Sequence, residues 1–201
     1  MIQLYEFAVS GNCHKVRLLL SLLGKEYQSI AVSGPQKEHK SAEFLLKNPF
    51  GQVPVLQDGE QIIRDSQAIL VYLAKAYGAD HWLPAEPAAM AAVIAWLSTA
   101  ANEVARGPAA LRVHYKFDRP INVTEAEGLC ANLLQVLQNR LQDHDWLAGT
   151  EISIADISIY TYIALAPEAR VDLQAYAAVR AWLGRIQGLP GYVGMDGMWQ
   201  A

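Results

Sequence analysis

The stretch Gly51-Gln52-Val53-Pro54-Val55-Leu56 is followed a short distance later by Asp65-Ser66. Val53 to Leu56 is a short apolar run of the kind that forms a strand, with turn residues before it and after it. A proline at the start of such a run has no N–H for a ladder, so the strand must begin there or lie at an edge. We expect a cis Val53-Pro54 bond, which would turn the backbone N–H and C=O of Val53 towards a ligand.

Asp65-Ser66 stand where a helix over residues 67–77 is expected to begin. The free backbone N–H groups of a helix start, together with a serine hydroxyl, suit a carboxylate. The acidic side chain at the same place suits an ammonium group. An edge of extended backbone, an anion-binding helix start and a carboxylate together predict a site for a small zwitterionic peptide.

These residues resemble the glutathione-binding signature of the cytosolic glutathione S-transferases, and the resemblance extends along the chain. It includes Ser10-Gly11-Asn12-Cys13, residues 39–44 (HKSAEF), Lys47-Asn48-Pro49, Leu147-Ala148-Gly149 and Ser153-Ile154-Ala155-Asp156. The chain is identified as a member of that superfamily, similar to its bacterial, theta, phi and beta types. The resemblance implies glutathione as co-substrate, a homodimer, a role in detoxification and a cytoplasmic location.

Composition excludes several other classes of function. Of the 201 residues, 52% are hydrophobic and 18% are charged, as in a folded globular protein. The net charge of −4, with no stretch rich in Lys and Arg, argues against a nucleic-acid partner. No apolar run approaches the ~18 residues of a membrane span, so no membrane partner is expected. Two cysteines form no disulfide framework, which favours a reducing cytoplasm.

Neither a metal nor a nucleotide is expected. The five histidines show no paired ligand spacing, and no P-loop or dinucleotide glycine pattern is present.

The order of the expected elements divides the chain into two domains. A strand over 2–7, a helix over 12–23 and a strand over 26–32 predict a parallel βαβ unit. A short helix over 41–46, a hairpin turning at Asp58-Gly59 and the helix over 67–77 follow. This order resembles the family's α/β thioredoxin-like domain. We expect that domain over 1–77, a linker rich in Gly and Pro over 78–87, and an all-helical domain over 88–201.

The second half is helical by its pattern. One long helix is expected over 88–115, with a kink at Gly107-Pro108. Capping boxes at Thr124-Glu127 and Ser153-Asp156 predict two further helix starts, and the first of these helices should run to about 142. A last helix is expected over 173–186, and the tail over 191–201 has no visible period.

Three neighbouring residues are candidates for activating the sulfur of glutathione. Ser10 precedes a helix N-terminus, where a hydroxyl can donate to an anion and the helix dipole favours a thiolate. From its position alone a helix cap is favoured for Ser10, whereas the resemblance makes Ser10 the expected donor to the thiolate. It resembles the activating serine of theta-like and phi-like members, within a Ser-x-Asn pattern that includes Asn12. Cys13 is the alternative, although the reactive cysteine and the histidine of beta-type members fall here on Gly11 and Ala105.

Further site residues are implied by the resemblance alone. His39 and Lys40 correspond to the residues that hold the glycine carboxylate of glutathione. The remaining positions are Gln52, Val53 and Pro54 for the backbone clamp, Asp65 and Ser66 for the γ-glutamyl end, Asn102 and Glu103 acting across a dimer interface, and Val9, Arg106 and Tyr115 for the electrophile pocket.

Three functions follow, in order of support. The first is conjugation of the glutathione thiolate to a small hydrophobic electrophile. The second is a glutathione-dependent thiol transferase or reductase that uses Cys13. The third is a non-catalytic binding module with the same fold, since fold alone never proves chemistry.

Overall fold

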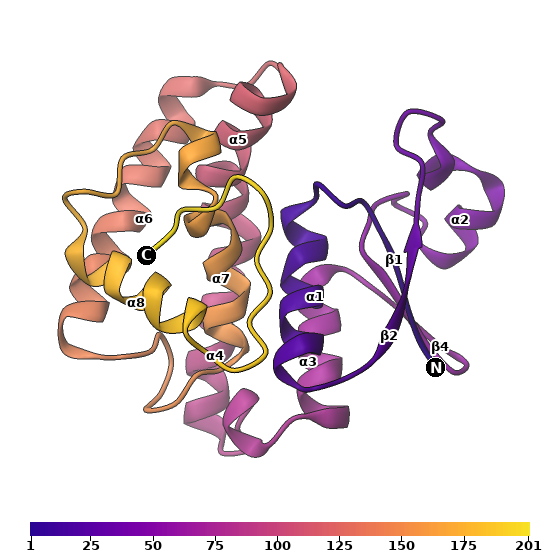
Figure 1. Cartoon of the computed structure of the whole chain (residues 1–201), viewed down its shortest axis with the longest axis horizontal. Coiled ribbons are helices and arrows are strands. Elements are labelled where there is room, and N and C mark those ends of the chain that lie inside the picture. Colours follow the sequence, from indigo (N-terminus) through magenta and orange to yellow (C-terminus); the bar gives the residue numbers. More distant parts are fainter.

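The computed structural model describes residues 1–201, in which a sheet with three helices lies beside a bundle of helices (Figure 1). The first part contains β1 (Ile2–Glu6), α1 (Gly11–Leu22), β2 (Tyr27–Ala31), α2 (Ala42–Lys47), β3 (Val55–Asp58), β4 (Gln61–Arg64) and α3 (Ser66–Tyr77). The second part contains α4 (Pro87–Thr99), α5 (Pro108–Phe117), α6 (Val123–Asp143), α7 (Ile154–Ala164) and α8 (Ala177–Gln187). Short 3-10 turns cover Glu38–Lys40, Asp80–Trp82 and Ala166–Ala169.

The sheet has the strand order β2-β1-β3-β4. β1 pairs with β2 in parallel, with Ile2 opposite Tyr27, so the predicted βαβ unit is confirmed. β1 and β3 are antiparallel, and β3 and β4 form the predicted hairpin, whose turn places Gly59 at φ +57°. α1 and α3 lie between the sheet and the helical part, while α2 lies on the opposite side (Figure 1). The thioredoxin-like arrangement is confirmed.

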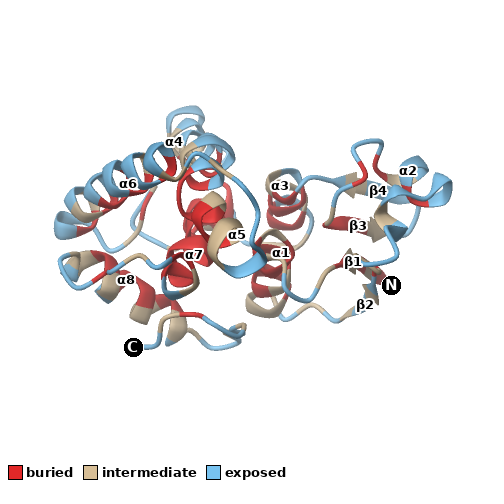
Figure 2. Cartoon of the chain, turned by 90° about the horizontal axis from the view of Figure 1, so that it is seen from above, coloured by how far each residue is buried: buried red, intermediate tan, exposed pale blue.

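Helix α7 is the centre of the helical part. Every one of its residues is buried, because it is apolar on all sides and is packed against α1, α3 and α4 (Figure 2). The predicted capping box at its start is confirmed: the Ser153 hydroxyl accepts from Ala155 N, and Asp156 Oδ2 accepts from Ser153 N at 3.0 Å. The other Asp156 oxygen accepts from Leu147 N and Trp182 Nε1, both at 3.0 Å.

Two predicted helix starts are wrong. Asn122, not Thr124, caps α6, because the Asn122 side chain accepts from Glu125 N at 3.2 Å. The last helix begins at Ala177 rather than at 173. Its first amides are capped by Gln138 of α6, which accepts from Ala178 N at 3.0 Å. A cap supplied by another helix leaves no local sequence signal.

The expected long helix is interrupted. α4 continues into a π-helical turn over Ala100–Val104, and α5 starts at Pro108, so the predicted break at Gly107-Pro108 is confirmed. A Cβ on Gly107 would lie 2.8 Å from Glu103 O and 3.1 Å from Cys130 N, so only glycine lets α6 approach this closely. By length and composition the helical run Pro87–Phe117 could cross a membrane, which is weak evidence because packed helices of soluble proteins pass the same test.

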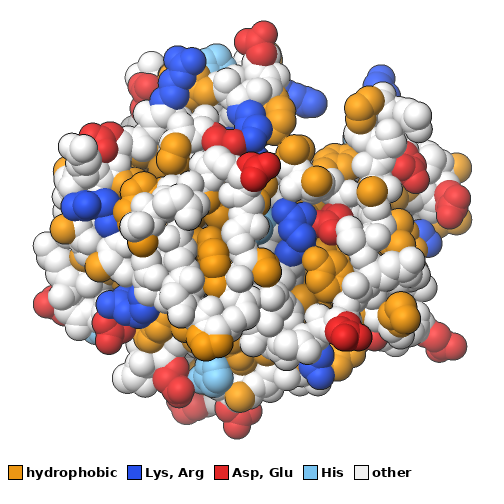
Figure 3. Space-filling model, in the orientation of Figure 1, with side chains coloured by type: hydrophobic (Ala, Val, Ile, Leu, Met, Phe, Trp, Pro, Cys, Tyr) orange, Lys and Arg blue, Asp and Glu red, His pale blue; other side chains and the backbone are white.

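The tail after Gly191 forms no helix, but it is held firmly between α1 and α7 (Figure 1). Trp199 N donates to Ala164 O at 2.6 Å, and the hydroxyls of Tyr192 and Tyr160 lie 2.8 Å apart. The His14 ring contacts Val193 O at 2.9 Å through Nε2. The tail therefore belongs to the core that joins the two parts. The face in Figure 3 carries acidic and basic side chains interspersed, with no stripe of one sign.

Candidate active site

The Val53-Pro54 peptide bond is cis, as predicted. β3 begins two residues after Val53, and the first registered pair of the ladder is Val55 with Arg64. Val53 therefore lies outside the sheet, in the loop just before β3, where an extended peptide could pair with its backbone.

Asn48 holds the loop that carries this bond. Its Nδ2 donates to Gln52 O at 2.7 Å and its Oδ1 accepts from Phe50 N at 3.1 Å. The side chain is only 3% exposed, so its bonds are shielded from water. Asn48 has no predicted role, although an asparagine before a proline is a turn signal that could have identified it.

His39 and Lys40 lie against the same loop. Lys40 Nζ donates to Phe50 O at 2.9 Å. Gly51 has φ +57°, and a Cβ there would lie 2.6 Å from His39 O, so glycine allows the contact. The His39 ring meets Phe7 edge-on at 5.3 Å between centroids, and its Nδ1 is buried without a partner.

Asp65 caps α3 in an unusual backbone conformation. Its Oδ1 accepts from Gln67 N at 2.8 Å and from Ala68 N at 3.2 Å. Its φ of 74° and ψ of 130° place a non-glycine residue in a region that costs about 1–3 kcal/mol. Ser66 follows and is buried at the first position of the helix. The strain holds a carboxylate and a hydroxyl side by side at the helix start.

A narrow groove joins these residues, and a larger cavity lies beside it. The groove is lined by Asn12, Asn48, Gln52, Val53, Pro54, Arg64, Asp65 and Ser66. The cavity has a volume of 420 Å³ and lies between the two parts of the molecule, where α1, α3, α5, α7 and the π-helical turn after α4 contribute to its wall. Asn12, Asp65 and Ser66 line both spaces. Arg64, which no sequence pattern indicated, lies over the Phe50 ring at 4.8 Å.

The start of α1 places the two predicted catalytic residues differently. Ser10 caps the helix, because its Oγ accepts from Cys13 N at 3.3 Å, and it lines neither the groove nor the cavity. Asn12 lines both. The Ser10 hydroxyl proton stays free to donate, since the cap uses only a lone pair. The junction of groove and cavity is nevertheless at Asn12.

Cys13 is fully buried. Burial raises the pKa of its thiol to about 11, so almost none of it is thiolate at neutral pH. Cys130, also buried, has its pKa raised to about 11 for the same reason. Neither cysteine has the exposed, electropositive surroundings of a reactive thiol.

Lys15 is a site residue that the sequence reasoning missed. It is 1% exposed and lines the cavity, with its ammonium 5.2 Å from the centroid of the Tyr162 ring. It lies one helical turn before Leu19, which belongs to the apolar face of α1, so the spacing could have indicated its burial.

The three residues predicted for the electrophile pocket do not meet. Val9 is 48% exposed on the loop after β1, and Arg106 pairs with Glu125 on the surface. Tyr115 lies under the guanidinium of Arg170, at 4.3 Å. A different face of α5 is turned to the cavity, and the apolar residues of its wall are Ala100, Ala101, Ala105, Ala109, Ala110, Val113, Ile121 and Tyr162.

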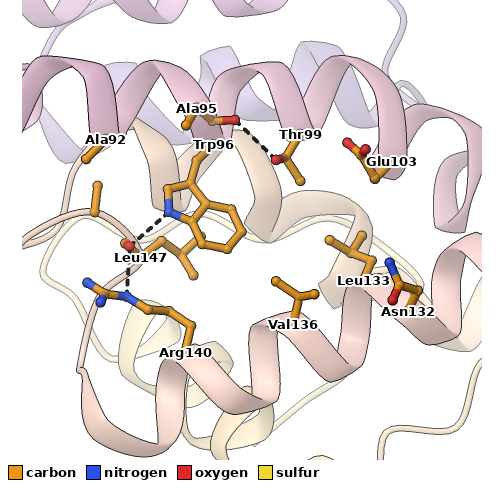
Figure 4. Close-up of a pocket in the computed structure, with 11 residues that line it drawn as sticks. Ala92, Ala95, Trp96, Thr99, Glu103, Asn132, Leu133, Val136, Arg140 and Leu147 are labelled. Atoms are coloured by element: carbon orange, nitrogen blue, oxygen red, sulfur yellow. Dashed lines mark hydrogen bonds between the residues drawn. The ribbon is translucent and has the colours of Figure 1, made fainter.

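Asn102 and Glu103 lie on the π-helical turn, and neither lines the groove or the cavity of its own chain. Glu103 instead lines another cavity, of 570 Å³, between α4 and α6 (Figure 4). Its far end is closed by Leu147 O, which accepts from Trp96 Nε1 at 2.9 Å and from Arg140 Nε at 3.0 Å. No cluster of metal-ligating side chains is present.

A thioredoxin-like half that carries a peptide clamp, joined to a helical half, defines a class of protein, and comparison with known proteins identifies the family. The family model described as "Glutathione S-transferase, N-terminal domain" matches residues 4–81, and "Glutathione S-transferase, C-terminal domain" matches residues 87–190. The chain belongs to the glutathione S-transferase family, a family of enzymes.

Individual relatives agree with this. "Glutathione S-transferase 1" of Zea mays is 30% identical over 94% of this chain and 92% of its own length. "Disulfide-bond oxidoreductase YfcG" of Escherichia coli is 32% identical over 94% of this chain and 92% of its own length. A solved glutathione transferase homologue from Drosophila mojavensis, with bound glutathione, has a TM-score of 0.84 and 30% identity, covering 94% of this chain and 88% of the other.

Proposed function

We propose that this transferase activates glutathione in the clamp groove and transfers its sulfur to a small hydrophobic electrophile in the adjoining cavity. The observation that carries the proposal is that Asn12, Asp65 and Ser66 line both spaces. A peptide thiol bound in the groove would have its sulfur at the mouth of a mostly apolar chamber. Proximity of this kind is a main source of rate enhancement.

The groove and the loop beside it offer complementary partners for each end of glutathione. The γ-glutamyl ammonium is assigned to Asp65, and the γ-glutamyl carboxylate to Ser66 at the start of α3. The cysteinyl backbone pairs with Val53, in the manner of an added strand. The glycine carboxylate is assigned to Lys40 and His39, whose Nδ1 has no partner within the chain.

The sulfur is assigned to the N-terminus of α1, where Asn12 lies at the junction of the two spaces. Its amide can donate to a thiolate, and the α1 dipole favours negative charge at the same point. Ser10 is the second donor, two residues before Asn12. Both contacts favour the thiolate over the thiol and therefore lower the pKa of bound glutathione.

The test is conjugation of glutathione to 1-chloro-2,4-dinitrobenzene by the wild type and by Val53→Gly/Pro54→Ala, which dismantles the clamp. The wild type should turn over and the double variant should lose affinity for glutathione. If the protein is retained on immobilised glutathione but turns over none of a broad panel of electrophiles, it is a non-catalytic binding module instead.

A second candidate function is reduction of disulfides by glutathione, favoured by the similarity to a relative named as a disulfide-bond oxidoreductase. The bound thiolate would attack one sulfur of the substrate disulfide and release the other as thiolate. The thiolate of a second glutathione would then attack the glutathione sulfur of this mixed disulfide, which forms oxidised glutathione and releases the remaining substrate sulfur as thiolate. Cys13 takes no part in this version, because it is buried and protonated. Turnover of 2-hydroxyethyl disulfide by the Cys13→Ala variant distinguishes it from the cysteine-based reductase.

We also propose a cytoplasmic homodimer formed through the helical part. Apolar side chains are exposed on α4 and α6, among them Ile94 and Val136, and Val136 lines the cavity between the two helices. In such a dimer Asn102 and Glu103 of one copy would approach the γ-glutamyl end bound to the other. Sedimentation of the wild type and of Ile94→Asp tests the assembly, and the affinity of Glu103→Gln for glutathione tests the role across the interface.

A further inference from the structure

The cavity beside the groove contains one cation. Among its thirteen lining residues only Lys15 is basic, and that side chain is 1% exposed. Lys15 donates no hydrogen bond and forms no ion pair within the chain, and its ammonium lies 5.2 Å from the centroid of the Tyr162 ring. A buried cation without a hydrogen bond or an ion pair is unusual, because buried charges in proteins are normally paired.

Burying this ammonium is costly, and no structural need for it is visible. Desolvation lowers the pKa of Lys15 to about 7, against the opposing charge of Asp65. A leucine or methionine would fill the same space beside Tyr162 without that cost. A compact anion brought into the cavity would remove the penalty, because it would pair with the ammonium in a dry site.

Asp65 is not free to serve as that anion. Its Oδ1 is engaged by two amides of α3. Its remaining acceptor capacity is assigned to the ammonium of glutathione in the proposed function. The two carboxylates of glutathione are assigned to Ser66 and to Lys40 with His39, so neither is assigned to Lys15.

Position along α1 separates Lys15 from the sulfur. Lys15 follows Asn12 by three residues, about 4.5 Å along the helix axis. The cavity that it lines also contains Tyr162, the alanines of the wall, Asp65 and Ser66, but not Gln52, Val53 or Pro54 of the clamp. The volume of 420 Å³ is that of a site for one small molecule, and the alanine wall suits a flat apolar ring.

We propose that the electrophile of this enzyme carries a carboxylate, and that Lys15 binds it in the cavity. This inference rests on the proposed function for its reaction, but the binding step stands apart from it. The glutathione thiolate attacks the electrophilic carbon, the carbon–sulfur bond forms and the leaving group departs with its electron pair. The carboxylate is unchanged and only fixes the orientation of the electrophile.

The experiment compares two acceptors that differ in one charge, 4-chloro-3-nitrobenzoate and 4-chloro-3-nitrobenzamide. Each rate is divided by the uncatalysed rate with glutathione, and chloride is the leaving group in both. The variant is Lys15→Met, which keeps the length of the side chain. The matched control is Lys25→Met, since Lys25 also lies over a tyrosine ring, that of Tyr77 at 4.7 Å, but outside the cavity.

We expect the wild type to favour the benzoate and Lys15→Met to lose roughly ten-fold to a hundred-fold of kcat/KM for it, mainly through KM. The benzamide should change less than about three-fold, and Lys25→Met should change neither. Equal losses on both acceptors would overturn the proposal, because Lys15 would then act on the sulfur or on the fold. No loss on the benzoate would overturn it as well.

A direct binding measurement tests the carboxylate site separately from the proposed conjugation. Calorimetry with 3-nitrobenzoate, which has no leaving group, is performed on the wild type and on Lys15→Met in the presence of S-methylglutathione. Binding to the wild type that is lost in the variant supports the carboxylate site even if neither acceptor is conjugated, in which case the proposed conjugation alone fails. Absence of 3-nitrobenzoate binding to the wild type overturns the carboxylate site.

Discussion

The phenol ring of Tyr162 occupies the space that a side chain at Gly11 would need. A Cβ built on Gly11 would lie 2.7 Å from Tyr162 Cζ and 3.1 Å from its hydroxyl oxygen. Tyr162 is itself buried on α7, so it cannot easily move. The position where beta-type relatives are expected to carry a reactive cysteine is thus closed here by a residue from the helical part.

Gly11→Cys should therefore destabilise the protein rather than install a nucleophile. Overpacking of a core contact costs about 1–3 kcal/mol. Urea unfolding measures this loss of stability. Gly11→Cys should cost less in a protein that already carries Tyr162→Ala than in the wild type, since the two sites are in contact. Gly128→Ala is the matched control, because Gly128 lies within α6 and a Cβ there meets nothing within 4 Å. That control should be neutral or stabilising by up to about 1 kcal/mol.

The next prediction separates the three candidates at the start of α1. Asn12→Ala should raise the pKa of bound glutathione and lower turnover at neutral pH roughly ten-fold to a hundred-fold. The defect should narrow as pH rises, because hydroxide then ionises the thiol without help. Thiolate absorbance in the ultraviolet, followed against pH, gives the pKa directly.

Ser10→Ala and Cys13→Ala serve as comparisons for that measurement. Ser10→Ala should cost ~1 kcal/mol of stability through the lost cap and lower turnover less than Asn12→Ala. Cys13→Ala should keep most activity. A Ser10→Ala enzyme with the larger rise in glutathione pKa would reassign the sulfur to Ser10, and a dead Cys13→Ala enzyme would restore the cysteine mechanism.

His14 predicts how stability depends on pH. Its ring is buried between Thr161 Oγ1 at 3.1 Å and Val193 O at 2.9 Å, and burial lowers its pKa to about 4. The pKa of histidine in the unfolded chain is about 6.5, so between these two values the unfolded chain binds one proton more at His14 than the folded protein. The contribution of His14 to stability is therefore fully present above about pH 6.5 and is lost as pH falls towards 4. The slope for one proton is about 1.4 kcal/mol per pH unit.

Urea unfolding of the wild type and of His14→Gln between pH 4.5 and 7 tests this. The stability of the wild type should fall more steeply on acidification than that of the variant. Asp156 has its pKa raised to about 6 by burial and contributes the opposite slope, but it is present in both proteins and cancels. Parallel curves would show that His14 is not held neutral.

Local patterns predicted the elements whose cause is local. The hairpin at Gly59, the Ser153-Asp156 box and the break at Gly107-Pro108 each depend on residues within a few positions of one another. The predicted start of the last helix failed because Gln138, far away in the sequence, caps it. The resemblance includes the clamp residues and Asn48, but it does not indicate the role of Asn48, which is to hold Gln52 in place.

The cavity is where sequence reasoning was weakest. Which face of α5 lines it depends on how the break at Gly107 directs that helix, and this cannot be read from a helical pattern. Val9, Arg106 and Tyr115 were therefore grouped, although they lie apart, and Lys15 was overlooked. The helical pattern does not indicate the burial of Arg112 either. Arg112 donates to Glu168 and to Val9 O, and the second bond joins α5 to the loop before α1.

The last prediction concerns Asp65, whose charge and cap can be separated. Asp65→Asn keeps an amide oxygen for Gln67 N and Ala68 N, and asparagine is among the residues that best tolerate positive φ. Its stability in urea should therefore change by less than about 0.5 kcal/mol. Its affinity for glutathione should fall roughly ten-fold or more, because the γ-glutamyl ammonium loses a charged acceptor. Asp65→Gly removes the cap as well as the strain, so it should bind as weakly as Asp65→Asn. Calorimetry with glutathione gives both affinities, and an Asp65→Asn protein that binds as tightly as the wild type would place the ammonium elsewhere in the groove.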